Sequence, residues 1–582
     1  MTRIFDDPAL FADDALDGFV AANRKYVARV TGGVVRSTAT PDGQVALVVG
    51  GGSGHYPAFA GVVGAGLAAG AVCGNVFTSP SAAQAYSVAR TAERGGGVLF
   101  SYGNYAGDVL HFGEAQGRLR ANGIDARTVL CTDDIASAPR QEIEKRRGIA
   151  GDFVVFKVAG AAAERGLSID DVERLARRAN ERTRTLGVAF AGCTLPGAAG
   201  ALFTVPQGRM SIGLGIHGEP GISEQDVPTA RELAKLLVER LLDDVPADRG
   251  SRVGVILNGL GTVKYEELFV LYSHVARLLE LAGLDIIDPE CGELVTSLDM
   301  AGLSLTVFWL DDELEPLWRD PANTPAFRKG IVAQPENVVI DQFVEFTPAH
   351  LVAGAASKQL AIATAALIAT AHQVVVENAD ELGRIDAIAG DGDHGTGMVR
   401  GLAAANNCAL QSLAAGAGVT ELLKSAGRAW SDRAGGTSGA LWGAALVAAG
   451  EELADRDGYS DSTVAAAAAA AVSAIITLGK AAPGDKTMID AMTPYITALQ
   501  KSITDGDTLA VAAAVAAQVA NDAAASTARL RPRLGRARPL AEKSLGHPDA
   551  GATSFALIVS RIAAVTAEKS TTAEAPNTKE PS

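Results

Sequence analysis

Residues 44–57 read QVALVVGGGSGHYP, a stretch that joins an apolar run to a glycine cluster and a histidine. Val45–Val49 is short and β-branched, which predicts a buried strand. The following GGGSG permits turns and close backbone approaches that a Cβ would prevent. Because ligands bind beyond the carboxyl ends of strands in open α/β sheets, His55 is a candidate site residue. A tight strand-to-helix turn with a structural histidine is the alternative.

Similar apolar runs recur through the first half of the chain and alternate with helical patterns. We expect strands at Gly97–Tyr102, Thr128–Cys131, Phe153–Val158, Ser211–Ile216, Arg252–Asn258 and Leu303–Leu310. We expect helices at Ile169–Arg184 and Ala230–Asp243. This alternation predicts an α/β architecture.

The pattern changes after residue 345, where helical segments follow one another with almost no strand between them. They are Leu351–Asn378, Gly401–Cys408, Val419–Trp430, Ala440–Ala454, Thr463–Leu478, Met488–Thr504, Thr508–Ala528 and Ser554–Ala567. We therefore expect an α/β domain over residues 1–330, a linker over 331–345 and an all-α domain over 346–567. The Thr-, Glu-, Lys- and Pro-rich residues 568–582 are expected to be a disordered tail.

Bulk composition limits the possible partners. A chain of 582 residues with 48% apolar and 20% charged residues has the composition of a globular protein, and it is long enough for three or four compact units that can merge into two domains. The formal net charge of −16 argues against nucleic acid as the main partner. A phosphate ligand would have to meet metal ions, helix N-termini or a few basic side chains.

The cysteine pattern and the N-terminus predict a soluble cytoplasmic protein. The five cysteines are far apart without a CxxC pair, which favours free thiols in a reducing compartment. Residues 1–7 lack the apolar segment of a signal peptide. The alanine-rich segment Thr463–Leu478 is expected to be a packed helix, because alanine is a strong helix former and a weak membrane anchor. We expect no membrane partner.

A second histidine lies in the glycine-rich stretch GLGIHGEPG at Gly213–Gly221. The stretch matches GxGxxG, but a dinucleotide site needs a helix to begin inside it, and the sequence Glu-Pro-Gly at 219–221 favours a turn. We therefore reject the dinucleotide interpretation. His217 remains a candidate site residue, with a structural role as the alternative.

An aspartate follows the strand expected at Gly97–Tyr102, in the sequence SYGNYAGDVLHF. Asp108 either caps a helix beginning at Val109 or belongs to a site. With His55 and His217 it forms a trio that suits acid/base chemistry on a polar small molecule, with one imidazole as a possible nucleophile.

In the helical half, RIDAIAGDGDHGTGM places Asp386, Asp391 and Asp393 within eight residues. Carboxylates this close repel one another unless a cation neutralises them. The spacing does not match an EF-hand, so a Mg²⁺-phosphate site is preferred. A solvated acidic turn is the alternative.

Two further loops could bind phosphate. Gly435–Gly439 precedes the helix expected at Ala440, and Gly484–Met488 precedes a helix at Ile489. Glycine followed by hydroxyl residues at a helix N-terminus can bind an anion. Because no GxxxxGK[ST] motif occurs, we expect a nucleotide held between Mg²⁺ and helix ends rather than a P-loop.

With these residues in view, the chain resembles ATP-dependent dihydroxyacetone kinases of the two-domain, single-chain type. The resemblance spans nearly the whole sequence through nine ordered motifs: GGGSGH, VCGNVFTSPS, NYAGD, GIHGEPG, TSLDMAG, GDGDHG, GGTSGALWG, GDKTMID and SLGHPDAGATS. It implies an N-terminal domain of two α/β subdomains, a C-terminal barrel of antiparallel helices, and the use of ATP and Mg²⁺. It also implies a homodimer in which the nucleotide domain of one chain can serve the partner's substrate domain.

The resemblance also implies roles for individual residues. His217 would form a covalent hemiaminal with the substrate carbonyl, and His55 as general base and Asp108 would act on the hydroxyl that is phosphorylated. Ketose contacts are implied for Gly52, Ser53, Gly54, His55, Gly103 and Asp108. Nucleotide contacts are implied for His394, Gly395, Thr396, Gly397, Thr437, Ser438, Gly479, Thr487, Met488, Asp549, Ala550 and Gly551. Metal ligation is implied for Asp386, Asp391 and Asp393.

Two departures from the family pattern bear on the substrate. Tyr56 follows His55 where the family usually has glutamate, and Gly103 stands where a lysine is common. Loss of the long cation would open space beside the substrate and remove a hydrogen-bond donor, which favours a larger or differently substituted ketose. The HYP variant resembles that of erythrulose kinases, so the resemblance favours erythrulose, D or L, over dihydroxyacetone or glyceraldehyde. Alternatives are a ketose-binding regulator or phosphotransferase-system component, and a nucleotide cyclase or lyase that uses the same metal loop.

Overall fold

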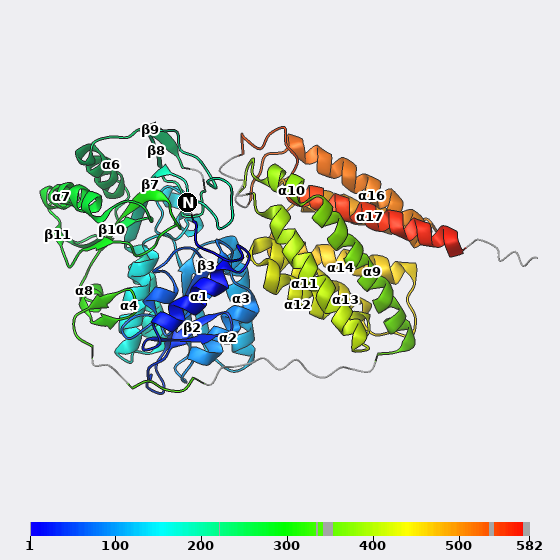
Figure 1. Cartoon of the computed structure of the whole chain (residues 1–582), viewed down its shortest axis with the longest axis horizontal. Helices are drawn as coiled ribbons and strands as arrows, with labels where there is room; N and C mark the ends of the chain where they lie inside the picture. The colour runs from blue at the N-terminus through cyan, green and yellow to red at the C-terminus, as the bar shows by residue number, and fades with distance from the viewer. Residues whose placement is uncertain are drawn as a thin grey trace, which may run out of the picture. The chain divides into compact units, whose positions relative to one another are not determined.

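The computed structural model divides the chain into two compact units, Met1–Phe346 and Thr347–Ser582 (Figure 1). The structure describes residues 2–219, 221–332, 336–340, 353–390, 392–534 and 541–573. The first unit is α/β and the second is helical, which confirms the predicted fold class.

A six-stranded sheet forms the first half of the first unit. Its strand order is β1-β2-β4-β3-β5-β6, and β3 is parallel to both β4 and β5. The strands are β1 (Val27–Val30), β2 (Gly33–Arg36), β3 (Ala46–Ser53), β4 (Gly70–Val76), β5 (Val98–Gly103) and β6 (Ala126–Cys131).

Helices cover both faces of this sheet. Ala46 and Val48 of β3 pack in one core with α2 and α3, whereas Leu47 and Val49 pack in another with α4 and α5. Burial on both faces explains why these strands are continuous apolar runs. The helices are α1 (Phe11–Ala22), α2 (Ala82–Ala92), α3 (Ala106–Ala121), α4 (Asp152–Glu164) and α5 (Ile169–Glu181).

The glycines after Val49 belong to β3 and do not form a loop. The strand continues to Ser53, with Gly50 opposite Val72 of β4. A Cβ on Gly51 would lie 2.7 Å from the Phe59 ring, and one on Gly52 would lie 2.7 Å from the backbone N of Thr78. The glycine cluster therefore serves close packing at the end of the strand, and the backbone turns only after it, at Gly54 with φ +106°.

A second, seven-stranded sheet completes the first unit. Its order is β11-β10-β13-β7-β8-β9, with β12 also paired to β10. One face packs against α6 and α7, and the other places Ile256 and Phe308 in the core that contains α4. The strands are β7 (Thr183–Ala191), β8 (Arg209–Ile212), β9 (Ser223–Asp226), β10 (Arg252–Gly259), β11 (Asp285–Ile286), β12 (Glu290–Gly292) and β13 (Ala301–Trp309).

Shorter elements complete this unit. The remaining helices are α6 (Ala230–Leu242), α7 (Tyr265–Leu281) and α8 (Leu314–Arg319), with 3-10 turns at Ala60–Val62 and Arg140–Lys145. Ala322–Asn323 (β14) and Arg328–Lys329 (β15) form a small hairpin.

The second unit is a bundle of helices. Its main core includes Leu402, Leu422 and Trp430, whose ring stacks on Trp442 at 5.2 Å between ring centroids. The helices are α9 (Ala355–Glu377), α10 (Ala379–Asp386), α11 (His394–Ala414), α12 (Val419–Ala434), α13 (Gly436–Leu453), α14 (Asp461–Gly479), α15 (Ile489–Thr504), α16 (Leu509–Ser526) and α17 (Ala550–Ala573). A 3-10 turn at Thr527–Arg529 follows α16.

Several local expectations were wrong. Phe153–Val158 is not a strand, because it lies inside α4, whose residues from Asp152 to Ala163 are all buried. A helix that is buried all round loses the 3.6-residue periodicity that would distinguish it from a strand. The helix expected to reach Arg184 ends at Glu181, and β7 begins at Thr183.

The ends of the second unit also differ from expectation. α10 was not anticipated, and α17 begins at Ala550 and continues to Ala573, past the expected start of the disordered tail. Residues 574–582 of that tail and much of the expected linker lie outside the described residues. The linker and tail therefore stay predictions.

Among the residues that the structure describes, four helices are apolar and long enough to cross a membrane, judged by length and composition alone. They are Ala355–Glu377, Asp461–Gly479, Leu509–Arg529 and Ala550–Ala567. The alanine-rich α14 buries Ala465, Val472 and Ile475 within the unit.

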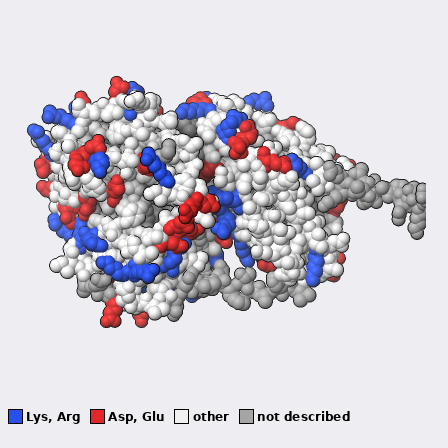
Figure 2. Space-filling model, viewed as in Figure 1, with Lys and Arg blue, Asp and Glu red and all other residues white. Residues whose placement is uncertain are grey.

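Figure 2 shows acidic and basic side chains next to one another over the visible face of the first unit.

Candidate active site

His55 is held by a backbone ladder between the segment after β3 and the TSLDMAG segment. Thr296 N donates to His55 O at 3.2 Å, and Leu298 N donates to Gly54 O at 2.8 Å. The Thr296 hydroxyl donates to Tyr56 O at 2.7 Å. The motif at 296–302 therefore fixes the position of the histidine rather than contributing a separate site.

The His55 imidazole is 1% exposed, and each of its ring nitrogens has a polar partner. Its Nδ1 lies 2.8 Å from Thr296 O, and its Nε2 lies 3.0 Å from Nε2 of His217. The ring stacks on Phe77 with centroids 5.0 Å apart. Burial, followed by the neighbouring His217, lowers the pKa of His55 to about 3.

His217 is held from its other side by Glu219. The Nδ1 atom lies 3.1 Å from Glu219 Oε1, and the backbone N of His217 donates to Glu219 Oε2 at 3.1 Å. The ring of Tyr105 meets His217 edge-on at 4.7 Å between centroids. The structure thus brings the two predicted histidines into direct contact and adds a carboxylate that the sequence analysis did not select.

Asp108 lies in the first turn of α3 and is 6% exposed. The helix begins at Ala106 with Tyr105 as its N-cap residue, so Asp108 is not the cap of a helix starting at Val109. Burial is the main cause that raises the pKa of Tyr102 and of Asp152, and the nearby charge of Asp108 contributes to raising both. A role for Asp108 beside the two imidazoles stays a prediction.

The space at Gly103 is filled by a neighbouring aromatic ring. A Cβ on Gly103 would lie 2.9 Å from Cε2 of Tyr105 and 3.1 Å from Gly148 O, and the Tyr105 hydroxyl donates to that same carbonyl at 3.0 Å. Gly103 therefore leaves room for Tyr105 to contact His217. The absent side chain does not simply open the pocket.

Tyr56 and two of the predicted ketose contacts, Ser53 and Gly54, adjoin His55 in the chain. The Tyr56 ring is 53% exposed and packs edge-on against Phe19 at 5.9 Å. The Ser53 hydroxyl donates to Gly74 O at 2.6 Å, which ties the end of β3 to β4. A Cβ on Gly54 would lie 2.8 Å from the Phe77 ring, so Gly54 allows Phe77 to approach.

In the second unit, two of the predicted metal ligands lie close together. Asp386 ends α10, Asp393 is the N-cap residue of α11, and Asp391 lies outside the described residues. Burial, followed by the charge of Asp386, raises the pKa of Asp393 to about 6. Burial also raises the pKa of Asp549 to about 7, with Asp386 contributing.

These carboxylate oxygens suit a hard cation, because crowded carboxylates require neutralisation. Within the described ranges, no group of three or more His, Cys, Asp or Glu side chains is close enough to hold a metal ion. A cation at Asp386 and Asp393 would thus need further oxygen ligands from a substrate, water or Asp391. That requirement fits Mg²⁺ bound to phosphates.

The predicted nucleotide residues occupy helix N-termini and the segments around them. The first turn of α11 contains His394, Gly395, Thr396 and Gly397, and the first turn of α13 contains Thr437 and Ser438. Thr487 and Met488 precede α15, Asp549 precedes α17, Ala550 and Gly551 begin α17, and Gly479 ends α14. His394 Nε2 lies 2.9 Å from the Ser554 hydroxyl of α17. Asp490 accepts from the backbone N of Thr487 at 2.9 Å and so shapes that loop.

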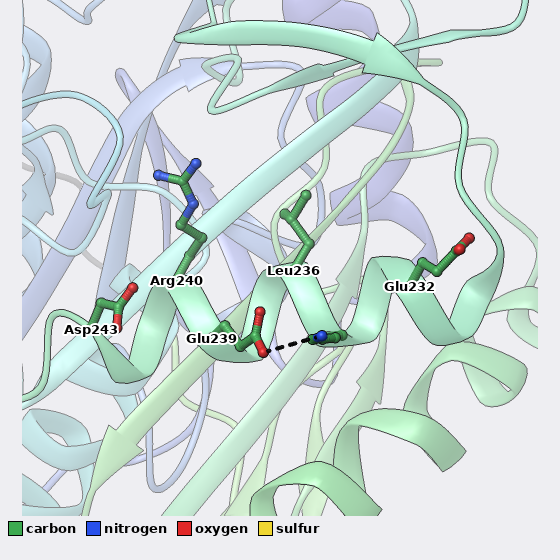
Figure 3. A pocket seen from close by; sticks show the side chains of 6 residues that line it. Glu232, Leu236, Glu239, Arg240 and Asp243 are labelled. Carbon is green, nitrogen blue, oxygen red and sulfur yellow. Dashed lines mark ion pairs between the residues drawn. The ribbon is translucent and has the colours of Figure 1, made fainter.

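A surface pocket of about 290 Å³ lies on α6 (Figure 3). Its lining residues are Glu232, Lys235, Leu236, Glu239, Arg240 and Asp243. Five of them lie on α6 and Asp243 is its C-cap residue, and none of the six is a predicted site residue. We assign it no chemistry, because no polar group from another element converges on it.

Sequence reasoning missed Glu219, Tyr105 and also Arg147, whose Nη1 lies 3.7 Å from Glu219 Oε2. Glu219 could have been found, since it stands two residues after His217 in the motif that was singled out. Tyr105 stands within NYAGD, yet nothing in its spacing predicts contact with a residue more than a hundred positions away. No sequence signal marks Arg147.

Two family models match the chain, the Dak1 domain over residues 17–326 and the DAK2 domain over residues 388–564. An L-erythrulose kinase from Pectobacterium atrosepticum is 55% identical over 97% of this chain and 96% of its own length. A D-erythrulose kinase from Mycolicibacterium smegmatis is 54% identical over 97% of this chain and 98% of its own. The crystal structure of the dihydroxyacetone kinase from C. freundii with AMP-PNP and Mg²⁺ is 27% identical, covers 97% of this chain and 99% of that chain, and has a TM-score of 0.52.

The α/β unit with its histidine pair and the helical unit with its acidic loop define a two-domain kinase of small ketoses. The chain belongs to the dihydroxyacetone kinase family, because the two domain models and the full-length relatives agree along nearly its whole length. The resemblance inferred from the ordered motifs is thereby confirmed.

Proposed function

We propose that this ketose kinase transfers the γ-phosphate of Mg·ATP to a terminal hydroxyl of erythrulose while His217 holds the substrate as a hemiaminal. The single observation that carries the covalent step is the 3.0 Å contact between the Nε2 atoms of His55 and His217. The imidazole nitrogen can add to a carbonyl carbon but not to the carbons of a polyol. Such a site therefore selects ketoses over polyols of similar size.

The hydrogen-bond partners determine how many protons the histidine pair holds. The carbonyl of Thr296 can only accept, so His55 Nδ1 carries a proton. Between His217 Nδ1 and Glu219 Oε1 lies one further proton, and the contact between the two Nε2 atoms requires another. The group His55–His217–Glu219 therefore holds one proton more than two neutral imidazoles and a carboxylate.

That extra proton supplies what carbonyl addition needs. Because burial makes His55 a very weak base, the proton resides toward His217 at rest. When the ketone carbon meets His217 Nε2, the proton passes to His55 and then to the carbonyl oxygen, while the N–C bond forms and the C=O π pair moves to oxygen. The adduct is an imidazolium balanced by Glu219, and His55 is left with a free lone pair on Nε2.

After addition, the same residues serve phosphoryl transfer. The transition state of this reaction is loose, so the hydroxyl needs only a weak proton acceptor. His55 Nε2 takes that role as general base, and Asp108 orients the hydroxyl and shares its proton. The main contribution is positioning, because covalent anchoring turns a bimolecular encounter into a fixed geometry.

On the nucleotide side, Asp386 and Asp393, with Asp391, would hold Mg²⁺, which neutralises charge on the ATP phosphates. The N-termini of α11, α13, α15 and α17 carry partial positive charge and present backbone N–H groups, which suit phosphate oxygens. The C. freundii dihydroxyacetone kinase, solved in complex with AMP-PNP and Mg²⁺, supports this part of the proposal.

Erythrulose is the proposed substrate because two relatives with over half of their residues identical are erythrulose kinases by name. Their identities are nearly equal and their names specify opposite enantiomers, so identity does not fix the chirality. The proposal includes a cytoplasmic homodimer, a substrate-binding domain over residues 1–330, a nucleotide-binding domain over 346–567, and all the remaining site roles given above.

The proposal is tested with the purified chain in a coupled ATP assay on D-erythrulose, L-erythrulose, dihydroxyacetone and glyceraldehyde. One erythrulose enantiomer is expected to give the highest kcat/KM. The His217→Ala variant is expected to abolish ketose phosphorylation and to bind Mg·ATP with unchanged affinity in calorimetry. Unchanged ketose turnover in His217→Ala would refute the covalent step.

A further inference from the structure

Arg147 lies in the loop between β6 and α4. Glu219 stands between Arg147 and His217. Its Nη1 is 3.7 Å from Glu219 Oε2, and its Nε and Nη2 bond to Asp134 Oδ2 at 3.1 and 2.8 Å. The other oxygen of Glu219 is the one that faces His217 Nδ1. The Glu219 carboxylate thus lies between a guanidinium on one side and the imidazole on the other.

The glycine-rich loop is shaped to admit this pair. A Cβ on Gly215 would meet Glu219 Oε2 and lie 2.6 Å from Arg147 Nη1. The loop closes around Glu219 through Gly215 N, which donates to Glu219 O at 2.9 Å. Arg147 Nη2 also donates to Gly213 O at 3.4 Å, so the guanidinium contacts the loop backbone as well.

Charge explains why a cation belongs here. The side chains of Arg147, Asp134 and Glu219 are 14%, 2% and 8% exposed, so their charges are poorly screened. Burial alone would lower the pKa of Arg147, but the charges of Asp134 and Glu219 raise it. Two carboxylates and one guanidinium leave one negative charge, which the extra proton of the histidine pair balances.

We propose that Arg147 is a positioning residue for the substrate-binding histidine. It keeps Glu219 ionised and oriented, so that His217 Nδ1 stays bonded and Nε2 stays directed at His55 and the ketone. This inference rests on the proposed function, because it assigns Arg147 a part in forming the His217 adduct. The charged and titratable groups that face His217 are His55 from the segment after β3, Glu219 from its own loop and Tyr105 at the start of α3; Arg147 acts through Glu219.

Removing the guanidinium charge has a predictable direction. Without Arg147 the cluster carries a second uncompensated negative charge, and it therefore holds its extra proton to higher pH. The alkaline limb of adduct formation, where the extra proton is lost, should shift upward by about one to three pH units, the usual effect of a charge within 4–6 Å. Below that limb the adduct yield should fall, because Glu219 is no longer held in position against His217 Nδ1.

The chain offers a matched control in the neighbouring Arg146. Its side chain is 1% exposed and its guanidinium bonds to Asp244 at 3.2 and 2.6 Å, on a different carboxylate. Arg146→Met removes an equally buried ion pair without touching Glu219. It should lower stability and leave the pH profile of adduct formation as in the wild type.

The experiment uses the full chain without nucleotide and erythrulose labelled with ¹³C at its carbonyl carbon. NMR follows loss of the carbonyl signal and growth of a tetrahedral-carbon signal across pH, with circular dichroism as the check of folding. Arg147→Met should shift the pH midpoint upward, and Arg147→Lys should keep it near the wild type. If Arg147→Met does not fold, Arg147→Lys should still give several-fold less adduct than Arg146→Lys, because an ammonium cannot contact both carboxylates.

Two results overturn the inference in distinguishable ways. If the wild type turns over ketose but gives no tetrahedral signal, the covalent step of the proposed function fails and this inference fails with it. If the wild type gives the signal and the Arg147 variants match their Arg146 counterparts in yield and pH midpoint, only the role of Arg147 is refuted.

Discussion

The Glu219→Gln substitution tests the proton arrangement most directly. The carboxylate accepts from His217 Nδ1 and from the backbone N of His217, each at 3.1 Å, and faces Arg147 at 3.7 Å. An amide has one oxygen and one NH₂ group, so it cannot accept on both sides. If the amide turns its NH₂ group toward Arg147 and the His217 backbone N, N–H donors face one another and no acceptor remains on that side. With its NH₂ group toward Nδ1, the imidazole is forced to carry its proton on Nε2, where it cannot attack.

The size of the expected loss in adduct formation follows from the buried, charge-assisted hydrogen bond between Glu219 and His217 that the substitution removes. Such hydrogen bonds contribute about 1.5–3 kcal/mol, which corresponds to about 10- to 150-fold in adduct formation. We expect kcat/KM for the ketose to fall by this factor. The affinity for Mg·ATP should not change, because Glu219 belongs to the α/β unit.

The assay combines steady-state kinetics on erythrulose, ¹³C detection of the adduct and calorimetry with Mg·ATP. Glu224→Gln is the matched control, since Glu224 lies on β9 nearby in sequence and its side chain is exposed. A fall of less than about threefold in Glu219→Gln, or an equal fall in Glu224→Gln, would refute the proton arrangement derived from the Nε2 contact.

Three further predictions concern other parts of the molecule. Gly103→Ala should displace Tyr105 from His217, cost about 1–3 kcal/mol of stability and raise KM for the ketose. An unchanged KM for erythrulose in the folded variant would contradict it. Asp386→Asn should abolish phosphoryl transfer while the ¹³C adduct forms as in the wild type, and loss of the adduct would show that the effect is on folding. Free His55 has a pKa of 6.5, whereas the folded value is lowered to about 3 by burial and by the neighbouring His217. The stability that depends on neutral His55 is therefore complete above pH 6.5 and is lost as the pH falls from 6.5 toward 3. Urea unfolding at stepped pH measures this slope, and an equal slope in His55→Asn would refute its assignment.

The chemistry-bearing residues were easier to predict than the elements that carry them. His55 and His217 could be selected because glycine-rich segments after expected strands mark ligand positions in α/β proteins. The strand at Phe153–Val158 was wrong because α4 is buried on every side, so its sequence carries no helical period. Asp108 was placed correctly near a helix start, but its position within the first turn depends on where the backbone leaves β5.

Glycine roles also depended on contacts that the sequence does not contain. The cluster after Val49 suggested a flexible, ligand-facing turn, whereas the structure uses it to pack Phe59 and the backbone of Thr78 against β3. Likewise, the missing side chain at Gly103 suggested an open pocket, but the Tyr105 ring fills that space. A glycine in the sequence indicates that a group approaches the backbone closely, and only the tertiary structure identifies that group.

By itself, the sequence determined the α/β and helical halves, the histidines, the acidic loop and the family resemblance. These depend on local patterns of apolar spacing and on short motifs, which the chain carries in order. Only the tertiary structure decided that the Nε2 atoms of His55 and His217 lie 3.0 Å apart, that Glu219 contacts His217, and that Arg147 lies next to Glu219. Those contacts join the end of β3 to a loop of the second sheet, residues more than a hundred and fifty positions apart, and no local pattern encodes a distance across the fold.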